Sequence, residues 1–423
     1  MSSVASAPAV SRGPAPGPLS RYRFVALGVV WSAYLVVFLS RLCVGPLAPF
    51  LKQAFHLDNA QIGGLTSATA LAYAPTLLLA GWLVDRIGVR SALVIGALVT
   101  GVFVGAVSFA PSYGVMLALL ALSGLGCGFI YPSAVKAVML WFPAHERATA
   151  IGFNQAAVNV SGMLGALIMP AVAVAFGWQA GFVVAAALAF VVCGLAVAFY
   201  HDPQAPSRVA PGVLLPVEAA AGVMPAAVCE IEQGLPCVTG DQEADRAALR
   251  PGFASVARSR DILLLGLAAM FLCMVEFSAM AHLVLFLKIE WAFAVAAAAG
   301  LLAVCQGAGA LGKPLSGLVS DRLLGRRRRP ALTFLAVLSA LSCAVLALTS
   351  PGHTWLLWVA LIGLGAGAGV TAAMDNVGIF IGPPLFGYIV DRTGSYSPAW
   401  WSMVAASLAA AGLLLFVREP QRP

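Results

Sequence analysis

Charged side chains are scarce in this chain of 423 residues, of which Asp, Glu, Lys and Arg make up only 10%. A soluble globular protein of ordinary composition carries about 25% charge, because water must solvate its surface. With 61% hydrophobic residues and a mean hydropathy of +0.93, this chain lacks the polar residues for such a surface. The composition excludes a soluble globule and predicts an integral membrane protein.

The sequence also lacks the usual motifs of enzymes and cofactor-binding proteins. We find no nucleophile-base grouping and no cluster of metal ligands. The glycine-rich run at residues 363–369 lacks the Lys-Ser or Lys-Thr of a phosphate loop and instead allows close helix packing. The net charge of +7 does not gather on one basic face with interleaved aromatics. We therefore expect no enzyme activity, no metal, no cofactor and no nucleic-acid partner.

Long apolar runs divide the chain into two halves. A helix needs roughly 20 mostly apolar residues to cross a bilayer. Residues 201–260, rich in Pro, Gly and mixed charge, predict a cytoplasmic linker between an N-terminal bundle at 24–200 and a C-terminal bundle at 261–417. Residues 1–23 and 418–423 are expected to be cytoplasmic tails, the first of them disordered and without the apolar core of a signal peptide. The predicted spans are 24–44, 62–83, 91–110, 114–139, 149–176 and 178–200, then 261–287, 293–317, 331–350 and 398–417.

One charged motif occurs in both halves. Residues 81–90 read G-x-L-x-D-R-x-G-x-R, and residues 317–326 carry a second copy, each between two apolar runs. The doubled motif, placed after the second and the eighth predicted helices, resembles the loop signature of the major facilitator superfamily of secondary transporters. The resemblance implies an all-α fold of two six-helix bundles with pseudo-two-fold symmetry, a central site and alternating access by a monomer.

The resemblance also implies a conformational latch in this motif. Asp85 would lie at the amino-terminal end of the eleventh helix, where the helix dipole favours an anion. The alternative is a solvated loop that only sets the orientation of the chain. The candidate latch residues are Gly81, Asp85, Arg86, Gly88 and Arg90, with Gly317, Asp321 and Arg322 in the second copy.

Basic residues predict the orientation of the chain. With a cytoplasmic amino terminus, thirteen arginines outside the linker fall on the cytoplasmic side, against Lys52, Lys288 and Arg392 on the other. Short loops rich in Lys and Arg remain on the cytoplasmic side. We therefore expect a multi-pass protein of the cell (inner) membrane, with its amino terminus in the cytoplasm and the lipid bilayer around it.

The tenth and eleventh helices are expected to be short. Residues 353–390 number 38, whereas two full spans and a turn need more than about 40. This stretch contains either two stunted helices that meet near Asp375 and Asn376, or one continuous span. We favour two helices, because Asp375 and Asn376 would be costly at the centre of a bilayer.

Four polar side chains are candidates for substrate binding. The region around Arg41 resembles that of anion-transporting members, and an arginine holds a carboxylate or phosphate by two parallel hydrogen bonds. Arg41 could instead extend to the outer headgroups. Gln155 and Asn159 share one helix face and could bind substrate or bridge helices. Tyr34 is a candidate cavity aromatic.

Glu276 is the acid deepest within an apolar span, and we predict that it couples transport to protons. The alternative is a neutral glutamic acid bonded to a neighbouring helix. The aspartate that precedes the arginine in many anion-transporting relatives is replaced here by Ser40, so coupling through that residue is excluded.

Residues 131–147 resemble the carriers of organic acids and sugar phosphates. We therefore predict a proton-coupled transporter of a small organic anion. A drug/proton antiporter is the first alternative, although residues 165–170 lack the Gly-Pro-x-x-Gly-Gly pattern of those proteins. The second is a sensor or degenerate relative that does not transport, which the short tenth and eleventh helices would favour.

Overall fold

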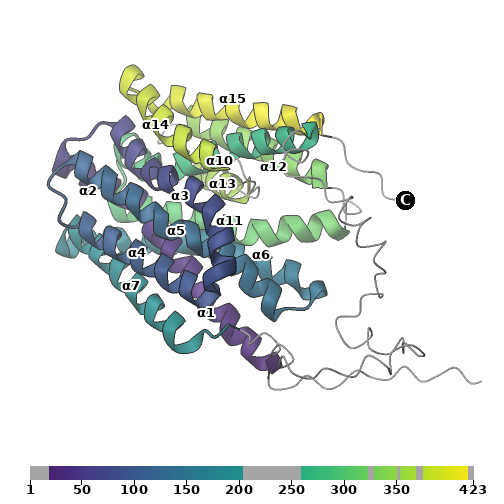
Figure 1. Ribbon diagram of the computed structural model, residues 1–423. Helices are drawn as coiled ribbons and strands as arrows, with labels where there is room; N and C mark the ends of the chain where they lie inside the picture. Colours follow the sequence, from purple (N-terminus) through teal and green to yellow (C-terminus); the bar gives the residue numbers. More distant parts are fainter. Residues whose placement is uncertain (1–18, 203–258, 323–327, 350–352, 368–374, 418–423) are drawn as a thin grey trace, which may run out of the picture.

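The computed structural model describes residues 19–202, 259–322, 328–349, 353–367 and 375–417, and their regular elements are all helices (Figure 1). The predicted all-α class is confirmed. The linker at 203–258 and the outer parts of the two predicted tails lie outside these residues. The first half contains α1 (Leu19–Leu42), α2 (Val44–Phe55), α3 (Asn59–Ile87), α4 (Val89–Val107), α5 (Tyr113–Trp141), α6 (Ala144–Phe176) and α7 (Trp178–Phe199). The second contains α10 (Arg260–Ile289), α11 (Val295–Arg322), α12 (Arg328–Leu348), α13 (Thr354–Gly367), α14 (Asp375–Thr393) and α15 (Tyr396–Leu415).

The lengths of these helices are those of a membrane protein. Within the described residues, nine spans are long and apolar enough to cross a bilayer, and α3 makes a tenth if its two bent parts are taken together. Many large apolar side chains point outward, among them Phe109, Val174 and Phe176. Lipid tails, unlike water, solvate such a surface without cost.

The first span is longer than predicted. By the length of the apolar run, this span was predicted over residues 24–44. The structure continues from α1 into α2, and the two form one span of 35 residues from Arg21 to Phe55. Pro46 is tolerated because it lies in the first turn of α2, where its missing N–H has no partner to lose.

The stretch with the expected shortening contains two separate helices. α13 has 14 residues and α14 has 19. This is the favoured alternative of two short helices. Asp375 is the first residue of α14.

The helices form two bundles, one from each half of the chain (Figure 1). The helix pairs that contact one another across the two bundles include α2 with α10, α3 with α10, α3 with α14, and α6 with α11. We call the end of the molecule that holds the α3–α4 turn the motif end. The end that holds the α2–α3 and α14–α15 turns is the opposite end.

One contact is repeated in both bundles. The Arg90 side chain, at the start of α4, donates to the carbonyl of Val197 near the end of α7. The Arg329 side chain, at the start of α12, donates in the same way to Leu415 at the end of α15. A cation is favourable at the negative end of a helix. The shared contact is a structural trace of the pseudo-two-fold symmetry.

Candidate substrate site between the bundles

Arg41 lies inside the molecule, with only 3% of its surface exposed. Its guanidinium carbon is 5.7 Å from the ring centre of Phe38, 4.7 Å from that of Tyr73 and 5.5 Å from that of Phe277. These rings come from α1, α3 and α10, so both bundles contribute. We call the three rings the Arg41 cage. Ring faces attract a cation, most strongly where water is excluded.

Arg41 sits too deep to reach the headgroups. The sequence analysis placed it near the outer end of the first helix, but α2 extends this span to Phe55. That adds roughly 20 Å of helix beyond Arg41, more than an arginine side chain can cover. The alternative of an arginine that extends to the membrane surface does not fit this position.

The Arg41 guanidinium has spare hydrogen-bond donors. Its Nε and Nη2 atoms are buried and have no hydrogen-bond partner among the described residues. Leaving a buried charged donor unpaired costs more than about 1–3 kcal/mol. An anion with two oxygens would satisfy both N–H groups at once.

Tyr34 and Gln155 lie on the same interior surface as Arg41. The Tyr34 hydroxyl donates to Gln155 Oε1 at 2.7 Å, and its ring stacks on Phe38 with 4.7 Å between centres. Tyr34, Phe38 and Arg41 are spaced four and three residues apart, which places them on one face of α1. The structure thus brings three of the four predicted substrate residues into one polar and aromatic lining.

Asn159, the fourth, is fully buried where α6 meets α11. A β-carbon at Gly309 of α11 would lie 2.3 Å from its Nδ2 atom, so the two helices approach closely there. Neither amide atom of Asn159 has a hydrogen-bond partner within the described part of the chain. The amide group packs between the bundles without hydrogen-bonding to the facing helix.

Glu276 lines a different space from the Arg41 cage, although it neighbours Phe277 in sequence. It borders a small cavity between α10, α11 and α13, together with Cys305, Gln306 and Gly365. The cavity has room for about one water molecule. An ionisable group beside a small, largely apolar cavity within the membrane is a position at which a proton can be held.

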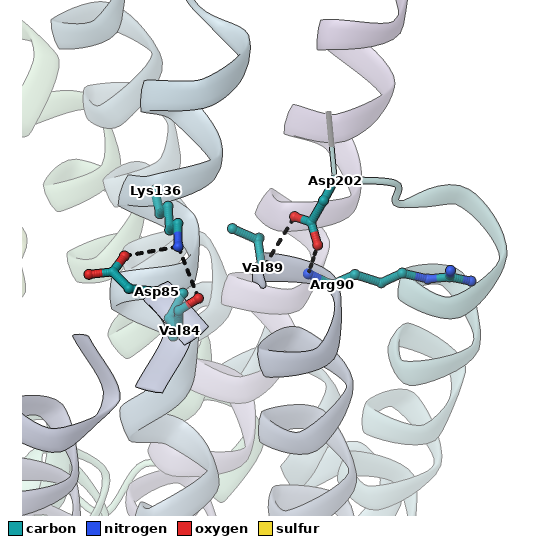
Figure 2. Close-up of polar contacts among 6 residues, drawn as sticks. All are labelled: Val84, Asp85, Val89, Arg90, Lys136 and Asp202. Atoms are coloured by element: carbon teal, nitrogen blue, oxygen red, sulfur yellow. Dashed lines mark hydrogen bonds and ion pairs between the residues drawn. The ribbon is translucent and has the colours of Figure 1, made fainter. Parts of the chain in front are cut away.

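The first motif copy makes its contacts within its own bundle (Figure 2). Lys136 of α5 pairs with Asp85 at 2.9 Å and donates to the Val84 carbonyl at 3.0 Å. The predicted latch would place Asp85 at the start of α14 instead. Because the Asp85 side chain is 72% exposed, the ion pair is screened and contributes little to stability.

The rest of the motif shapes the α3–α4 turn. Gly88 has a φ of 83°, and the next two backbone N–H groups donate to Asp202 at 3.1 and 3.3 Å (Figure 2). Arg86 lies over the Trp82 ring at 3.9 Å. A β-carbon at Gly81 would meet nothing within 4 Å. In the second copy, the side chains of Gly317, Asp321 and Arg322 lie outside the described residues.

Two groups of residues in these contacts were not predicted from the sequence. Tyr73 and Phe277 of the cage carry no local signal, because an aromatic residue in an apolar span is ordinary. Asp391, which contacts α3 from the end of α14, did carry one. Residues 387–394 read G-Y-I-V-D-R-T-G, close to the G-W-L-V-D-R-I-G of residues 81–88. This repeat could have been found by comparing the chain with itself.

Two bundles of apolar helices, with the buried Arg41 guanidinium between them, indicate a membrane transporter of small molecules. The chain belongs to the Major Facilitator Superfamily, whose family model matches residues 30–375. It is 26% identical to a probable sulfoacetate transporter of Cupriavidus necator, over 93% of this chain and 92% of that one. It is 23% identical to a hexuronate transporter of Bacillus subtilis, over 91% and 92% of the two chains.

A solved structure shares the fold. This is the inward-facing, occupied form of a bacterial homologue of the human lysosomal transporter Spinster, with a TM-score of 0.69. The alignment covers 94% of this chain and 97% of that one at 18% identity. The predicted major facilitator fold is therefore confirmed.

Proposed function

We propose that this protein is a secondary transporter of a small organic anion and that Arg41 binds the anionic group. The observation that supports this most directly is the buried guanidinium between the bundles, with Nε and Nη2 unpaired among the described residues. A carboxylate or sulfonate presents the planar or tripod oxygens that fit these donors. The relatives named for sulfoacetate and hexuronate transport carry substrates of this charge.

The site is built for alternating access. The Arg41 cage has rings from both bundles, so a rocking motion that separates α10 from α1 and α3 would open it. The rings of the cage come from both bundles of one chain, and we propose that the transporter works as a monomer. From the distribution of arginine, we place the motif end and the amino terminus on the cytoplasmic side of the inner membrane.

Uptake into liposomes tests this function. The purified protein would be reconstituted and supplied with labelled sulfoacetate, a hexuronate, a sugar phosphate and a lipophilic drug cation. Saturable uptake of one anion class, with no drug movement, is the expected result. Drug movement against a proton gradient would support the antiporter instead. No movement of any compound, in protein with a native helical spectrum, would favour a sensor or degenerate relative.

We further propose that Glu276 carries the coupling proton. Glu276→Gln keeps the size and hydrogen-bonding atoms of the side chain but cannot take up a proton. Proton-driven accumulation should fall to the equilibrium level, because the mutant cannot bind and release the coupled ion. Exchange of labelled for unlabelled anion without a gradient should continue. Both are measured in liposomes, with and without an imposed pH difference.

Glu290→Gln is the matched control for this test. Glu290 follows α10 at its far end and is exposed, so its neutralisation should leave accumulation unchanged. Normal accumulation by Glu276→Gln would remove Glu276 from the coupling mechanism.

A further inference from the structure

α14 ends with a third copy of the charged motif, at the opposite end of the molecule from the first. The shared pattern at residues 81–88 and 387–394 is a glycine, an aromatic residue, two aliphatic residues and Asp-Arg-x-Gly. Each copy ends in a tight turn between two helices, at Gly88 and at Gly394. The motif thus occurs at both ends of the transporter.

The two copies share their local geometry. Arg392 lies over the ring of Tyr388 at 5.3 Å, as Arg86 lies over the ring of Trp82. Gly394 has a φ of 69° and Gly88 a φ of 83°, positive values that favour glycine at both turns. In both copies the arginine is held on the aromatic residue four positions earlier, which leaves the aspartate free to make other contacts.

The aspartates differ in what they contact. Asp391 Oδ1 accepts hydrogen bonds from the backbone N of Asn59 at 3.0 Å and from its side-chain Nδ2 at 2.6 Å. Asp391 Oδ2 accepts from the backbone N of Ala60 at 2.8 Å. Asn59 and Ala60 open α3 in the first bundle, whereas Asp391 belongs to the second. A carboxylate from one bundle thus caps a helix of the other, where the helix dipole favours it.

Neighbouring groups support this contact. Lys52 Nζ donates to Asn59 Oδ1 at 2.8 Å, and the Tyr396 hydroxyl lies 3.4 Å from the same atom. A β-carbon at Gly387 would lie 2.2 Å from the Asn59 carbonyl oxygen, so the glycine allows α14 to approach α3. A lysine from the first bundle and a tyrosine from the second hold the Asn59 side chain between them.

α3 does not need Asp391 to begin. The Asp58 side chain, within the first bundle, already accepts a hydrogen bond from the backbone N of Gln61 at 2.6 Å. The Gln61 side chain in turn accepts one from the backbone N of Asp58 at 3.1 Å. This is a complete capping box. The contacts of Asp391 are additional to it and join two bundles that must separate during transport.

We propose that Asp391 is a latch that holds the opposite end of the transporter closed, and that its release from α3 opens that end. In α6 of the first bundle, Val174 lies three residues before the turn glycine Gly177, as Asp391 lies three residues before Gly394. Val174 is exposed and apolar, so the latch is present on one side of the pseudo-two-fold axis only. The latch acts on the empty transporter, and its test is therefore independent of the substrate.

Distances between spin labels at the opposite end test the latch. Labels would replace Gln53 on α2 and Glu290 after α10, both exposed, in a chain whose native cysteines are replaced. In nanodiscs, the labelled protein that retains Asp391 should show mainly short distances between the two labels. Asp391→Asn keeps the size of the side chain but loses its charge and one acceptor. Because Asp391 is exposed, solvent weakens its charged hydrogen bonds, and we expect the ratio of long to short distances to rise by about threefold to tenfold.

Asp58→Asn is the matched control, because it removes an equal negative charge from the start of the same helix without touching α14. It should leave the distances unchanged. Asn59→Asp is a second variant, which places a like charge against Asp391 and should also favour long distances. Unchanged distances in both Asp391→Asn and Asn59→Asp would overturn the proposal. An equal shift in Asp58→Asn would also overturn it, by showing that only the stability of the α3 start is involved.

Discussion

Replacing Arg41 by lysine should lower the ratio of the maximal uptake rate to the half-saturating anion concentration by at least about tenfold. The ammonium group of lysine is a point donor and cannot form the two parallel hydrogen bonds of a guanidinium. Loss of one hydrogen bond to a charged group removes about 1.5–3 kcal/mol, which corresponds to a factor of ten or more. Initial uptake rates in liposomes, measured over a range of anion concentrations, give the effect.

The control for this substitution is Arg23→Lys. Arg23 pairs with Glu146 at 3.0 Å in a partly exposed position at the motif end, and lysine can keep that ion pair. Uptake by this variant should be close to that of the unmodified protein. If Arg41→Lys had the same kinetics as Arg23→Lys, Arg41 would have no part in anion binding.

A Gly63→Ala substitution should prevent the opposite end from closing and should abolish net transport. A β-carbon at Gly63 would lie 2.2 Å from the carbonyl oxygen of Pro383 and 2.3 Å from its carbon. These are backbone atoms of α14 and cannot rotate away, so α3 and α14 must move apart. With labels at Gln53 and Glu290, we expect mainly long distances, together with uptake at background level.

Gly64→Ala is the neighbouring control. The nearest atom to a β-carbon there is the Tyr113 hydroxyl at 2.7 Å, the end of a side chain in the same bundle. That side chain can shift without separating the bundles, so distances and uptake should change little. Wild-type distances and transport in Gly63→Ala would show that the approach of α3 to α14 is not needed for closure.

The Arg41 cage illustrates a trade-off between stability and function. A buried cation with unpaired N–H groups destabilises the empty protein, even with three rings around it. Apolar replacements that stabilise such sites in other proteins would here remove the group that recognises the anion. The cost of burial is offset when the substrate supplies the missing acceptors.

Local features of the chain predicted much of the fold. The membrane class, most helix positions, the two halves and the motif at Asp85 follow from composition, run length and repetition, which are properties of neighbouring residues. The two short helices in this part of the chain were predicted by comparing the length of residues 353–390 with the length that two full spans and a turn require. The first span was predicted to end near residue 44, whereas α2 continues it to Phe55, and Pro46 is accommodated because it lies in the first turn of α2.

Contacts between distant helices had to come from the tertiary structure. A membrane helix is apolar on every side, so its pattern does not show which face meets another helix. The depth of Arg41, its rings from three helices and the Asp391 contact with α3 all depend on that choice of face. The sequence by itself determined that the chain is a duplicated membrane transporter, and the packing of its helices decided where a cation is buried and where the Asp391 carboxylate meets α3.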